Sequence, residues 1–200
     1  MAAKSKKKIV DKWKLKKWYD IIAPAMFQNK VIGEAVAIDE NSMMNRIIEV
    51  GSGELGIGAE EGRRSFSTIK VKLRVIEVKG KQAHTKYIGH QTLQSYLKTL
   101  ARRGRSVMDV VLDVETKDGE KFRFKTIIIS ANTLSQNTKK NLRHAAKEAI
   151  LEAVPQLTAE EVIMETLNGK LSGKVYSKIK QITRIMKVEI KKLERAETFR

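Results

Sequence analysis

The segment from Met108 to Ser130 constrains the fold most strongly, because its alternating side chains specify both a β-hairpin and its register. A three-residue loop over Lys117–Gly119 would use Gly119 for the positive φ angle that such loops need. This loop gives four cross-strand pairs, two apolar and two of opposite charge: Val114–Phe122, Leu112–Phe124, Glu115–Lys121 and Asp113–Arg123. A two-residue loop would set Glu115 against Phe122, so we predict the three-residue loop.

Apolar periodicity predicts that strands come first along the chain and helices later. Strands are expected over residues 31–38, 46–50 and 67–78, and helices over 90–103, 138–154 and 158–168. Segment 67–78 has an apolar face and a cationic face: Ile69, Val71, Leu73 and Val75 on one, Lys70, Lys72 and Arg74 on the other. Segment 176–193 mixes the two periods, and we favour a short helix running into a final strand. This order predicts an α+β fold with a mainly antiparallel β-barrel-like domain, flanking helices and a basic N-terminal extension.

These elements divide the chain into three predicted parts. Residues 1–17 form a basic flexible arm, too rich in lysine to pack alone. Residues 18–134 form a β-rich core domain with one helix near 91–103. Residues 135–200 form a helical region with a final strand near 184–193. Residues 18–27 should be an extended segment docked on the core, because the proline within them disfavours a helix.

The positive charge of the chain predicts a polyanionic partner. The chain has 40 Lys and Arg against 23 Asp and Glu, a net charge of +17 and a pI near 10.0. Eight lysines lie within residues 1–17, but the rest of the chain is basic as well. Because 42% of the residues are hydrophobic, most of the chain should also fold around a core.

The sequence lacks the residues of metal, disulfide and membrane sites. There are no cysteines, so neither a disulfide framework nor a thiolate metal site can form. His84, His90 and His144 lack metal-ligand spacing, and no HExxH or Walker motif occurs. Residues 1–17 have no apolar stretch of the signal-peptide kind, and no apolar run approaches the length of a membrane span. The arm also lacks a clear apolar stripe, so RNA is favoured over a lipid surface.

A glycine-rich loop imitates a dinucleotide-binding motif. Gly51, Gly53 and Gly56 follow a strand-like run, and Glu77 lies near the offset expected of a ribose-binding carboxylate. Such a site needs a helix directly after the glycines, because its N-terminal N–H groups hold the pyrophosphate. Further glycines and two glutamates follow instead, so we interpret residues 51–62 as a strand connection. We therefore expect no enzyme, no cofactor and no small-molecule substrate.

Cations gather in four clusters that suit phosphate contacts. They are the arm, the cationic face of segment 67–78, the arginines after segment 90–103, and the start of segment 138–154, where positive charge opposes the helix dipole. Each lysine alone could equally face water. Trp13 is the candidate for stacking on a base, whereas Trp18 and Tyr19 are expected to anchor the arm to the core. The predicted RNA-binding residues are Lys6, Lys7, Lys8, Lys12, Trp13, Lys14, Lys16, Lys17, Arg63, Arg64, Lys70, Lys72, Arg74, Arg102, Arg103, Arg105, Lys139, Lys140 and Arg143.

The sequence also resembles a known family. The pattern Lys17-Trp-Tyr-Asp-Ile-Ile-Ala-Pro-Ala-Met-Phe27, followed by Ile32-Gly33, is similar to the archaeal and eukaryotic small-subunit ribosomal protein family S3Ae, also called eS1. Further similar segments follow in order over nearly the whole chain: Asn45–Glu49 with Glu54-Leu55, Arg102–Ser106 and Asp113–Gly119. The chain departs from the family pattern at Asn45, Gly51 and Gly53.

The resemblance implies a structural protein of the small ribosomal subunit, in the cytoplasm, on the platform near the messenger exit. It implies a β-barrel-like domain with surrounding helices and basic extensions, and no catalytic residues. The implied partners are small-subunit ribosomal RNA, neighbouring platform proteins and messenger RNA near the exit. Two alternatives stay open: a free RNA-binding translation factor and, less favoured, a nucleotide-dependent enzyme that uses the loop Gly51–Gly56.

Overall fold

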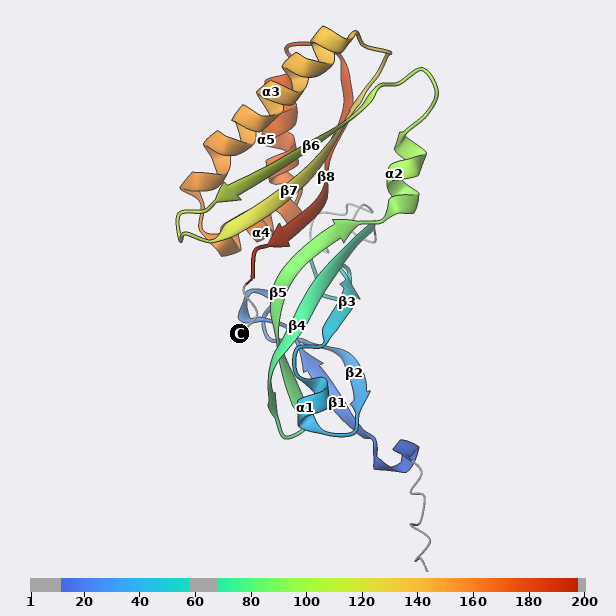
Figure 1. The fold of residues 1–200 in the computed structure, drawn as a ribbon, viewed down its shortest axis with the longest axis vertical. Coiled ribbons are helices and arrows are strands. Elements are labelled where there is room, and N and C mark those ends of the chain that lie inside the picture. Colours follow the sequence, from blue (N-terminus) through green and yellow to red (C-terminus); the bar gives the residue numbers. More distant parts are fainter. Residues whose placement is uncertain (1–11, 58–67, 198–200) are drawn as a thin grey trace, which may run out of the picture. The chain divides into compact units, whose positions relative to one another are not determined.

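The computed structural model describes residues 12–57 and 68–197 of the chain (Figure 1). Within these ranges, eight strands belong to one mixed, mainly antiparallel sheet, accompanied by five α-helices. The pairing order is β2-β1-β5-β8-β7-β6, while β4 pairs with both β3 and β5. The chain divides into two compact units: a first unit of residues up to 48 with 74–86, and a second unit of residues 49–73 with those from 87 onward.

The first unit consists of short strands around a small apolar core. Its elements are β1 (Lys17–Ile22), β2 (Val31–Ala37), α1 (Glu40–Met43), the start of β3 (Ile47–Gly51), and parts of β4 (Ile69–Lys79) and β5 (Gln82–Thr92). Strand β1 pairs antiparallel with β2 and parallel with β5. Tyr19 and Ile21 of β1 pack in this core with Val75 and Ala83, because alternate residues of a strand share one face. The strands expected over 31–38, 46–50 and 67–78 are thus confirmed as β2, β3 and β4.

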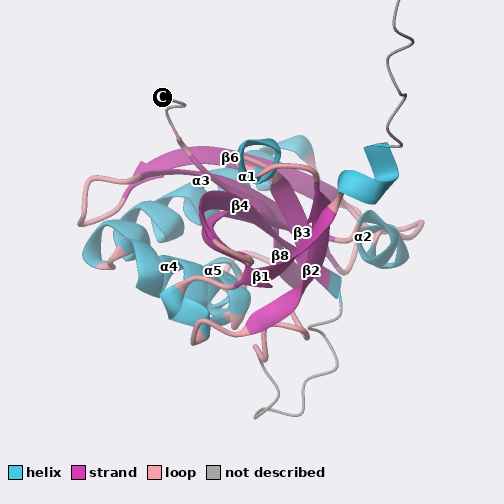
Figure 2. Cartoon of the chain, turned by 90° about the horizontal axis from the view of Figure 1, so that it is seen from below, coloured by secondary structure: helices cyan, strands magenta, loops and turns pink. Residues whose placement is uncertain are grey.

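The second unit is a sheet with helices on both faces. Its further elements are α2 (Gln94–Leu100), β6 (Val107–Glu115), β7 (Lys121–Ser130), α3 (Gln136–Ala153), α4 (Ala159–Leu167), α5 (Lys170–Ile179) and β8 (Ile185–Arg195). Helix α3 contacts β6 and α5, and α5 contacts β8, so these helices cover one face of the sheet (Figures 1 and 2). Helix α2 packs on the other face, where Leu97 contacts Ile127 and Ile129.

The predicted hairpin register is confirmed in the pairing of β6 with β7. All four predicted pairs are present: Val114–Phe122, Leu112–Phe124, Glu115–Lys121 and Asp113–Arg123. The N–H of Thr116 donates to the Glu120 carbonyl oxygen at 2.9 Å and closes the three-residue loop, in which Gly119 has a φ of 74°. The Arg123 guanidinium donates to both carboxylate oxygens of Asp113, at 2.7 and 2.9 Å.

The helices expected late in the chain are also present. Helix α3 begins after Ser135, whose hydroxyl accepts from the N–H of Thr138 at 3.3 Å. Helix α4 begins at a capping box: the Thr158 hydroxyl accepts from the Glu161 N–H at 3.4 Å, and the Glu161 carboxylate accepts from the Thr158 N–H at 2.8 Å. These bonds lower the pKa of Glu161. Segment 176–193 contains the end of α5 and most of β8, as we favoured.

Two expectations around β5 need correction. The helix expected near 91–103 is shorter at both ends. At its start, Gln91 still pairs with Lys192 of β8, and after Leu100 the backbone adopts an extended conformation. Strand β5 itself was not predicted. Its buried positions alternate, but they include small or polar residues such as Thr85 and Gly89, which give little hydropathy signal.

The described strands do not close into the barrel-like sheet that we expected. The pairing order of the described strands is open, with β2 and β6 at the ends of its main path and β3 at the end of a branch. In the second unit, α3 and α5 bury the apolar face of the sheet, and a sheet covered by helices does not need to close on itself. The fold is α+β with a mainly antiparallel sheet. The three-part division at residues 17 and 134 stays a prediction.

Candidate nucleic-acid interface

The predicted basic arm is described only in its last residues. Residues 12–15 form a 3₁₀ turn, and Trp13 within it is 66% exposed. The Lys16 ammonium lies 4.0 Å from the centre of the Trp13 ring, a cation–π contact that keeps a positive charge beside the predicted stacking residue. Lys14 and Lys17 are exposed. Six predicted contacts, or their side chains, lie outside the described residues: Lys6, Lys7, Lys8, Lys12, Arg63 and Arg64.

The expected anchoring role of two aromatic residues is half correct. Tyr19 is 3% exposed and lies in the core of the first unit. Trp18 precedes it on β1, so its side chain points to the opposite face, and it is 61% exposed. Trp18 is therefore a second exposed aromatic side chain, and an exposed ring is the kind of group on which a base can stack. Our sequence reasoning did not name it, although strand alternation places it on the face opposite Tyr19.

Glu49 partly neutralises the cationic face of β4. The ammonium groups of Lys70 and Lys72 each lie 3.3 Å from a carboxylate oxygen of Glu49. Hydrogen bonds from Lys72 and Lys70 lower the pKa of Glu49, so the carboxylate stays charged. A phosphate would have to compete with this carboxylate for the two lysines, which makes them weaker candidates than their sequence pattern suggests. Arg74, on the same strand, is half-buried.

Three predicted arginines lie in the loop between α2 and β6. Arg102 Nε donates to the Thr99 carbonyl oxygen at 3.3 Å, and Arg105 Nη1 donates to the Leu100 carbonyl oxygen at 3.1 Å. Both side chains thus satisfy carbonyl groups at the end of α2, where cations are favourable. Arg103 is exposed. The loop therefore presents three guanidinium groups, two of which are held in place by backbone contacts.

The start of α3 carries the next predicted cluster. Lys140 and Arg143 are exposed and Lys139 is half-buried, and the first turn contains no acidic residue. The N-terminus of a helix already carries partial positive charge, so these side chains add to an uncompensated positive potential. Binding of an external anion would neutralise this positive potential.

Hydrogen bonds hold the arginine loop beside the start of α3. The Ser106 hydroxyl accepts from the Leu134 N–H at 3.0 Å, and the Ser106 N–H donates to the Ser130 hydroxyl at 3.0 Å. The Ala131 N–H donates to the Arg184 carbonyl oxygen at 3.1 Å. This bond holds the segment between α5 and β8 beside the other two segments. Figure 1 shows the same convergence, since β6, α3 and β8 begin, and β7 ends, at one end of the second unit.

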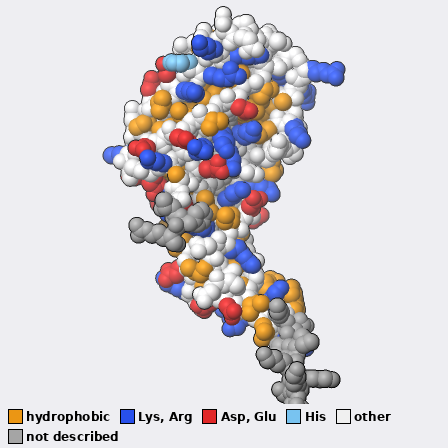
Figure 3. Space-filling view, viewed as in Figure 1, with side chains coloured by type: hydrophobic (Ala, Val, Ile, Leu, Met, Phe, Trp, Pro, Cys, Tyr) orange, Lys and Arg blue, Asp and Glu red, His pale blue; other side chains and the backbone are white. Residues whose placement is uncertain are grey.

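We name this region the basic end. It comprises the cations of three chain segments: Arg102, Arg103, Arg105, Lys139, Lys140, Arg143, Lys180 and Arg184. In the described part of the chain, no carboxylate forms an ion pair with any of them. Residues 94–108, 130–147 and 170–188 contain no Asp or Glu at all. Figure 3 shows Lys and Arg side chains over this end, and such a surface attracts a polyanion.

Sequence reasoning missed Lys180 and Arg184. Both are exposed, and Arg184 is tied to the end of β7 through its backbone. The absence of acidic residues over 170–188 is visible in the sequence and indicates a segment whose cations have no nearby carboxylate along the chain. What the sequence did not reveal is that this segment meets the other two acid-free segments in space.

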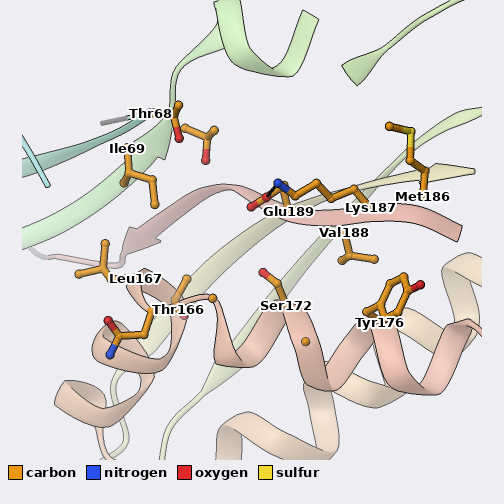
Figure 4. Close-up of a pocket in the computed structure, with 14 residues that line it drawn as sticks. Thr68, Ile69, Thr166, Leu167, Ser172, Tyr176, Met186, Lys187, Val188 and Glu189 are labelled. Carbon is orange, nitrogen blue, oxygen red and sulfur yellow. Dashed lines mark ion pairs between the residues drawn. The ribbon is translucent and has the colours of Figure 1, made fainter. Parts of the chain in front are cut away.

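A groove of about 360 Å³ lies between α5 and β8 (Figure 4). Ser172 and Tyr176 line it from α5, and Lys187 and Glu189 line it from β8, with 2.9 Å between the Lys187 ammonium and the Glu189 carboxylate. Burial alone would lower the pKa of Lys187, but bonds with Tyr96 and Glu189 outweigh it and raise the pKa. A lysine held protonated is neither nucleophile nor general base at neutral pH, so Lys187 does not have the protonation state of either.

The described part of the glycine-rich loop does not form a dinucleotide-binding turn. Strand β3 ends at Gly51, and residues 52–57 form turns instead of beginning a helix. Residues 58–67 lie outside the described ranges. Among the residues that the structure describes, no three His, Asp or Glu side chains are grouped to hold a metal ion. No helix in these ranges is both long and apolar enough for a membrane span.

Comparison with known proteins agrees with the resemblance. The Ribosomal S3Ae family matches residues 4–198. Small ribosomal subunit protein eS1 of Staphylothermus marinus is 34% identical over 192 residues, which cover 96% of this chain and 88% of that protein. The eS1 proteins of Methanococcus vannielii and Methanothermobacter thermautotrophicus are 33% and 32% identical, over 96% and 95% of this chain and 86% and 95% of their own lengths.

These matches extend over nearly the full chain and the relatives are archaeal, as the resemblance implied. The matching family is one of ribosomal proteins and not of enzymes, which confirms that no catalytic site is to be expected. The chain belongs to the Ribosomal S3Ae family.

Proposed function

We propose that this chain is a structural constituent of the small ribosomal subunit, in the cytoplasm, and binds ribosomal RNA through the basic end. Its relatives are small ribosomal subunit proteins eS1, which supports the small ribosomal subunit as the particle that contains the chain. The basic end supports the mode of binding, because its eight cations have no carboxylate partner among the described residues. Phosphate contacts would fix the orientation, and the shape of the folded RNA would set the place.

The proposal includes a position on the platform, near the messenger exit, as the family resemblance implies. Neighbouring platform proteins are then partners, with messenger RNA near the exit as a further contact. The lysines of residues 1–17 would follow grooves of the RNA, and Trp13 would stack on an unpaired base. Arg63 and Arg64, together with the arginines and lysines of the basic end, would make the firmer phosphate contacts.

A matched pair of variants tests the basic end. The first variant replaces four exposed cations of the basic end by glutamine: Arg103, Lys140, Arg143 and Arg184. The control replaces four cations that are ion-paired within the chain: Lys121, Arg123, Lys125 and Lys192. Both variants lose the same charge. Binding to transcribed fragments of small-subunit ribosomal RNA is measured over a series of salt concentrations.

The basic-end variant should lower the slope of log affinity against log salt by about 3, because each phosphate contact contributes about 0.7–0.9. The control should change the slope much less, because its cations already have partners. Equal losses in both variants would mean that only net charge matters, and the assignment to the basic end would be wrong.

Deletion of residues 1–17 tests the arm in the same assay. The deletion should weaken binding and lower the salt slope, because the segment carries eight lysines. An unchanged slope would assign the arm to solubility alone.

A free RNA-binding translation factor is the alternative that fits the same charge distribution. The two functions differ in a high-salt gradient of ribosomal particles. A structural constituent should co-sediment with small subunits at high salt, whereas a transient factor should be released.

A further inference from the structure

Strand β6 offers an edge that has no neighbouring strand in the described part of the chain. It is the terminal strand of the pairing order, nine residues long, and its register with β7 is continuous. Figures 1 and 2 show it at the margin of the sheet. Regular strand edges of this kind present backbone donors and acceptors to other chains, and proteins usually blunt them with charged side chains, especially lysine, with proline or with a bulge. The nine residues of β6 contain no lysine, proline or bulge, and all of their charged side chains are carboxylates, so the edge excludes acidic partners and stays open to a basic one.

The register identifies the unpaired backbone groups. The Ser130 N–H donates to the Ser106 carbonyl at 3.0 Å, and the Thr116 N–H donates to the Glu120 carbonyl at 2.9 Å. The even-numbered residues of β6 therefore exchange hydrogen bonds with β7, because these bonds alternate along an antiparallel pair. The N–H and C=O groups of the odd-numbered residues point away from β7: Val107, Asp109, Val111, Asp113 and Glu115. In the described chain, no other backbone group bonds to them.

The side chains of the same residues specify the chemistry of a partner. Val107 and Val111 are 41% and 53% exposed, and the three carboxylate residues of the edge are exposed as well. On the same face, β6 is negative and β7 is positive: Asp109, Asp113 and Glu115 against Lys121, Arg123 and Lys125. Each of these carboxylates already contacts one cation of the chain, Glu115 with Lys121, Asp113 with Arg123 and Asp109 with Lys191. A carboxylate has about four acceptor positions, so each can accept from a further cation as well. A strand added beyond β6 continues this alternation of charge when its outward side chains are Lys or Arg.

RNA and a second copy of the chain both fit this edge poorly. The carboxylates of β6 repel phosphates, and a nucleic acid does not offer alternating N–H and C=O groups at strand spacing. A second copy paired edge to edge around Val111 would set Asp109 against Asp113, and like charges directly opposite are destabilising.

We propose that the β6 edge binds an extended basic segment of a neighbouring protein by strand addition. Lys or Arg side chains lie opposite the carboxylates, and an apolar side chain lies opposite Val111. The inference rests on the proposed function, since the neighbour is another protein of the small subunit. The chain then has two binding surfaces of opposite character: the basic end for RNA and the β6 edge for protein.

Hydrogen–deuterium exchange tests the edge without any mutation. The amides of Asp109, Val111 and Asp113 should exchange rapidly in the free full-length chain. In small subunits that contain the chain they should exchange about 100-fold more slowly, because exchange then requires local opening. The amides of Val110 and Leu112, which bond to β7, are the control and should be protected in both states. Equal exchange of the edge amides in both states would overturn strand addition.

This experiment separates the two proposals. If the chain does not co-sediment with small subunits, the proposed function fails before the edge is measured. If it co-sediments and its edge amides stay unprotected, only the strand addition fails.

A photo-crosslinking residue identifies the occupant of the edge. Val111 is replaced by p-benzoylphenylalanine, and small subunits that carry the variant are irradiated. Cross-links to a protein, in an extended segment rich in Lys or Arg, are expected. Cross-links to ribosomal RNA, to a second copy, or to residues 1–17 of the same chain would overturn the proposal.

A synthetic peptide of alternating Lys and Val tests the charge rule on the free chain. It should protect the edge amides, and a peptide of alternating Glu and Val should not. Asp109→Lys reverses one charge of the edge and leaves the Asp113–Arg123 pair intact. It should weaken the binding of the Lys peptide about threefold. Glu160→Lys, the same charge change on α4, should leave binding unchanged. Equal weakening by the two variants would contradict binding at this edge.

Discussion

The outer face of the β6-β7-β8 sheet and the basic end both carry several cations but differ in the neighbours of those cations. On the sheet, the cations face carboxylates of the same chain: Lys121 with Glu115, Arg123 with Asp113, and both Lys125 and Lys192 with Glu194. At the basic end, three acid-free segments meet and no such pair forms among the described residues. A count of cations along the sequence is therefore a poor guide to phosphate sites, and the distribution of carboxylates in space is a better one.

The difference also separates two kinds of mutational effect. The sheet satisfies its charges internally, so changes there should lower stability and leave RNA affinity intact. The basic end concentrates like charge, so changes there should lower RNA affinity and leave the stability of the free chain intact or improve it. Each prediction below tests one side of this division.

The largest expected effect is on the sheet, at Gly89. This residue pairs with β8, and a Cβ atom there would overlap the backbone carbonyl oxygen of Leu193. Because a backbone atom cannot rotate away, Gly89→Ala should lower the free energy of unfolding by about 3 kcal/mol, as measured by urea denaturation. Gly33→Ala, another strand glycine but with no heavy atom within 4 Å of the added Cβ, is the control. Equal stability of the two variants would contradict the close approach of β5 and β8.

The second prediction concerns charge reversal at the basic end. The double variant Arg103→Glu, Lys140→Glu should bind small-subunit RNA fragments at least about 30-fold more weakly near 0.1 M salt, since two phosphate contacts are lost. Its thermal midpoint without RNA should stay the same or rise, because like-charge repulsion is relieved. A fall in stability with unchanged affinity would mean that these residues serve the fold, and the two regions would no longer differ.

Local rules predicted the parts of the fold that depend on nearby residues. The hairpin register followed from one glycine and four side-chain pairs, and the start of α4 followed from the Thr158–Glu161 capping box. Strand β4 followed from the alternation of Val71, Leu73 and Val75. In each case the interacting residues lie within a few positions, or across a short loop, so the pattern itself contains the contact.

Features that depend on distant pairing could not be predicted from the sequence. Strand β5 buries Gly89 because β8, about 100 residues later, approaches it, and nothing in the local hydropathy records that approach. The pairing of Glu49 with Lys70 and Lys72 also required the placement of β3 beside β4. The basic end was predicted in part, since its arginines and lysines were named, but its limits are set by three segments that only the fold brings together.

The third prediction uses pH to test the burial of His90 in the sheet. His90 is fully buried, 2.6 Å from the Tyr87 hydroxyl, and burial lowers its pKa from 6.5 to about 3. The unfolded chain therefore binds a proton below pH 6.5 that the folded chain excludes down to about pH 3, so stability falls as the pH decreases through this window. The loss should be about 1 kcal/mol between pH 6.5 and about 5.5.

The variant His90→Gln should remove this part of the pH dependence, as measured by urea denaturation at several pH values. A wild-type stability that is flat across the window would mean that the imidazole reaches solvent in the folded chain.

The smallest expected effect is the coupling between Lys125 and Glu194 on the sheet. The two groups lie 3.1 Å apart, and each is somewhat more than one-third exposed. Burial alone would raise the pKa of Glu194, but hydrogen bonds from Lys192 and Lys125 outweigh it and lower the pKa. The contribution of Glu194 to stability is thus present above its unfolded pKa of 4.5 and is lost as the pH falls through its lowered value.

A double-mutant cycle of Lys125→Met and Glu194→Gln should give a coupling free energy of about 0.5 kcal/mol, typical of exposed pairs. The coupling should disappear near 1 M salt, where the screening length is about 3 Å. Lys125→Met should leave RNA affinity nearly unchanged, because this lysine already has a carboxylate partner. If it instead weakened RNA binding as much as Arg103→Gln, ion pairing within the chain would not prevent phosphate contact, and the sheet face would have to be counted as part of the RNA-binding surface.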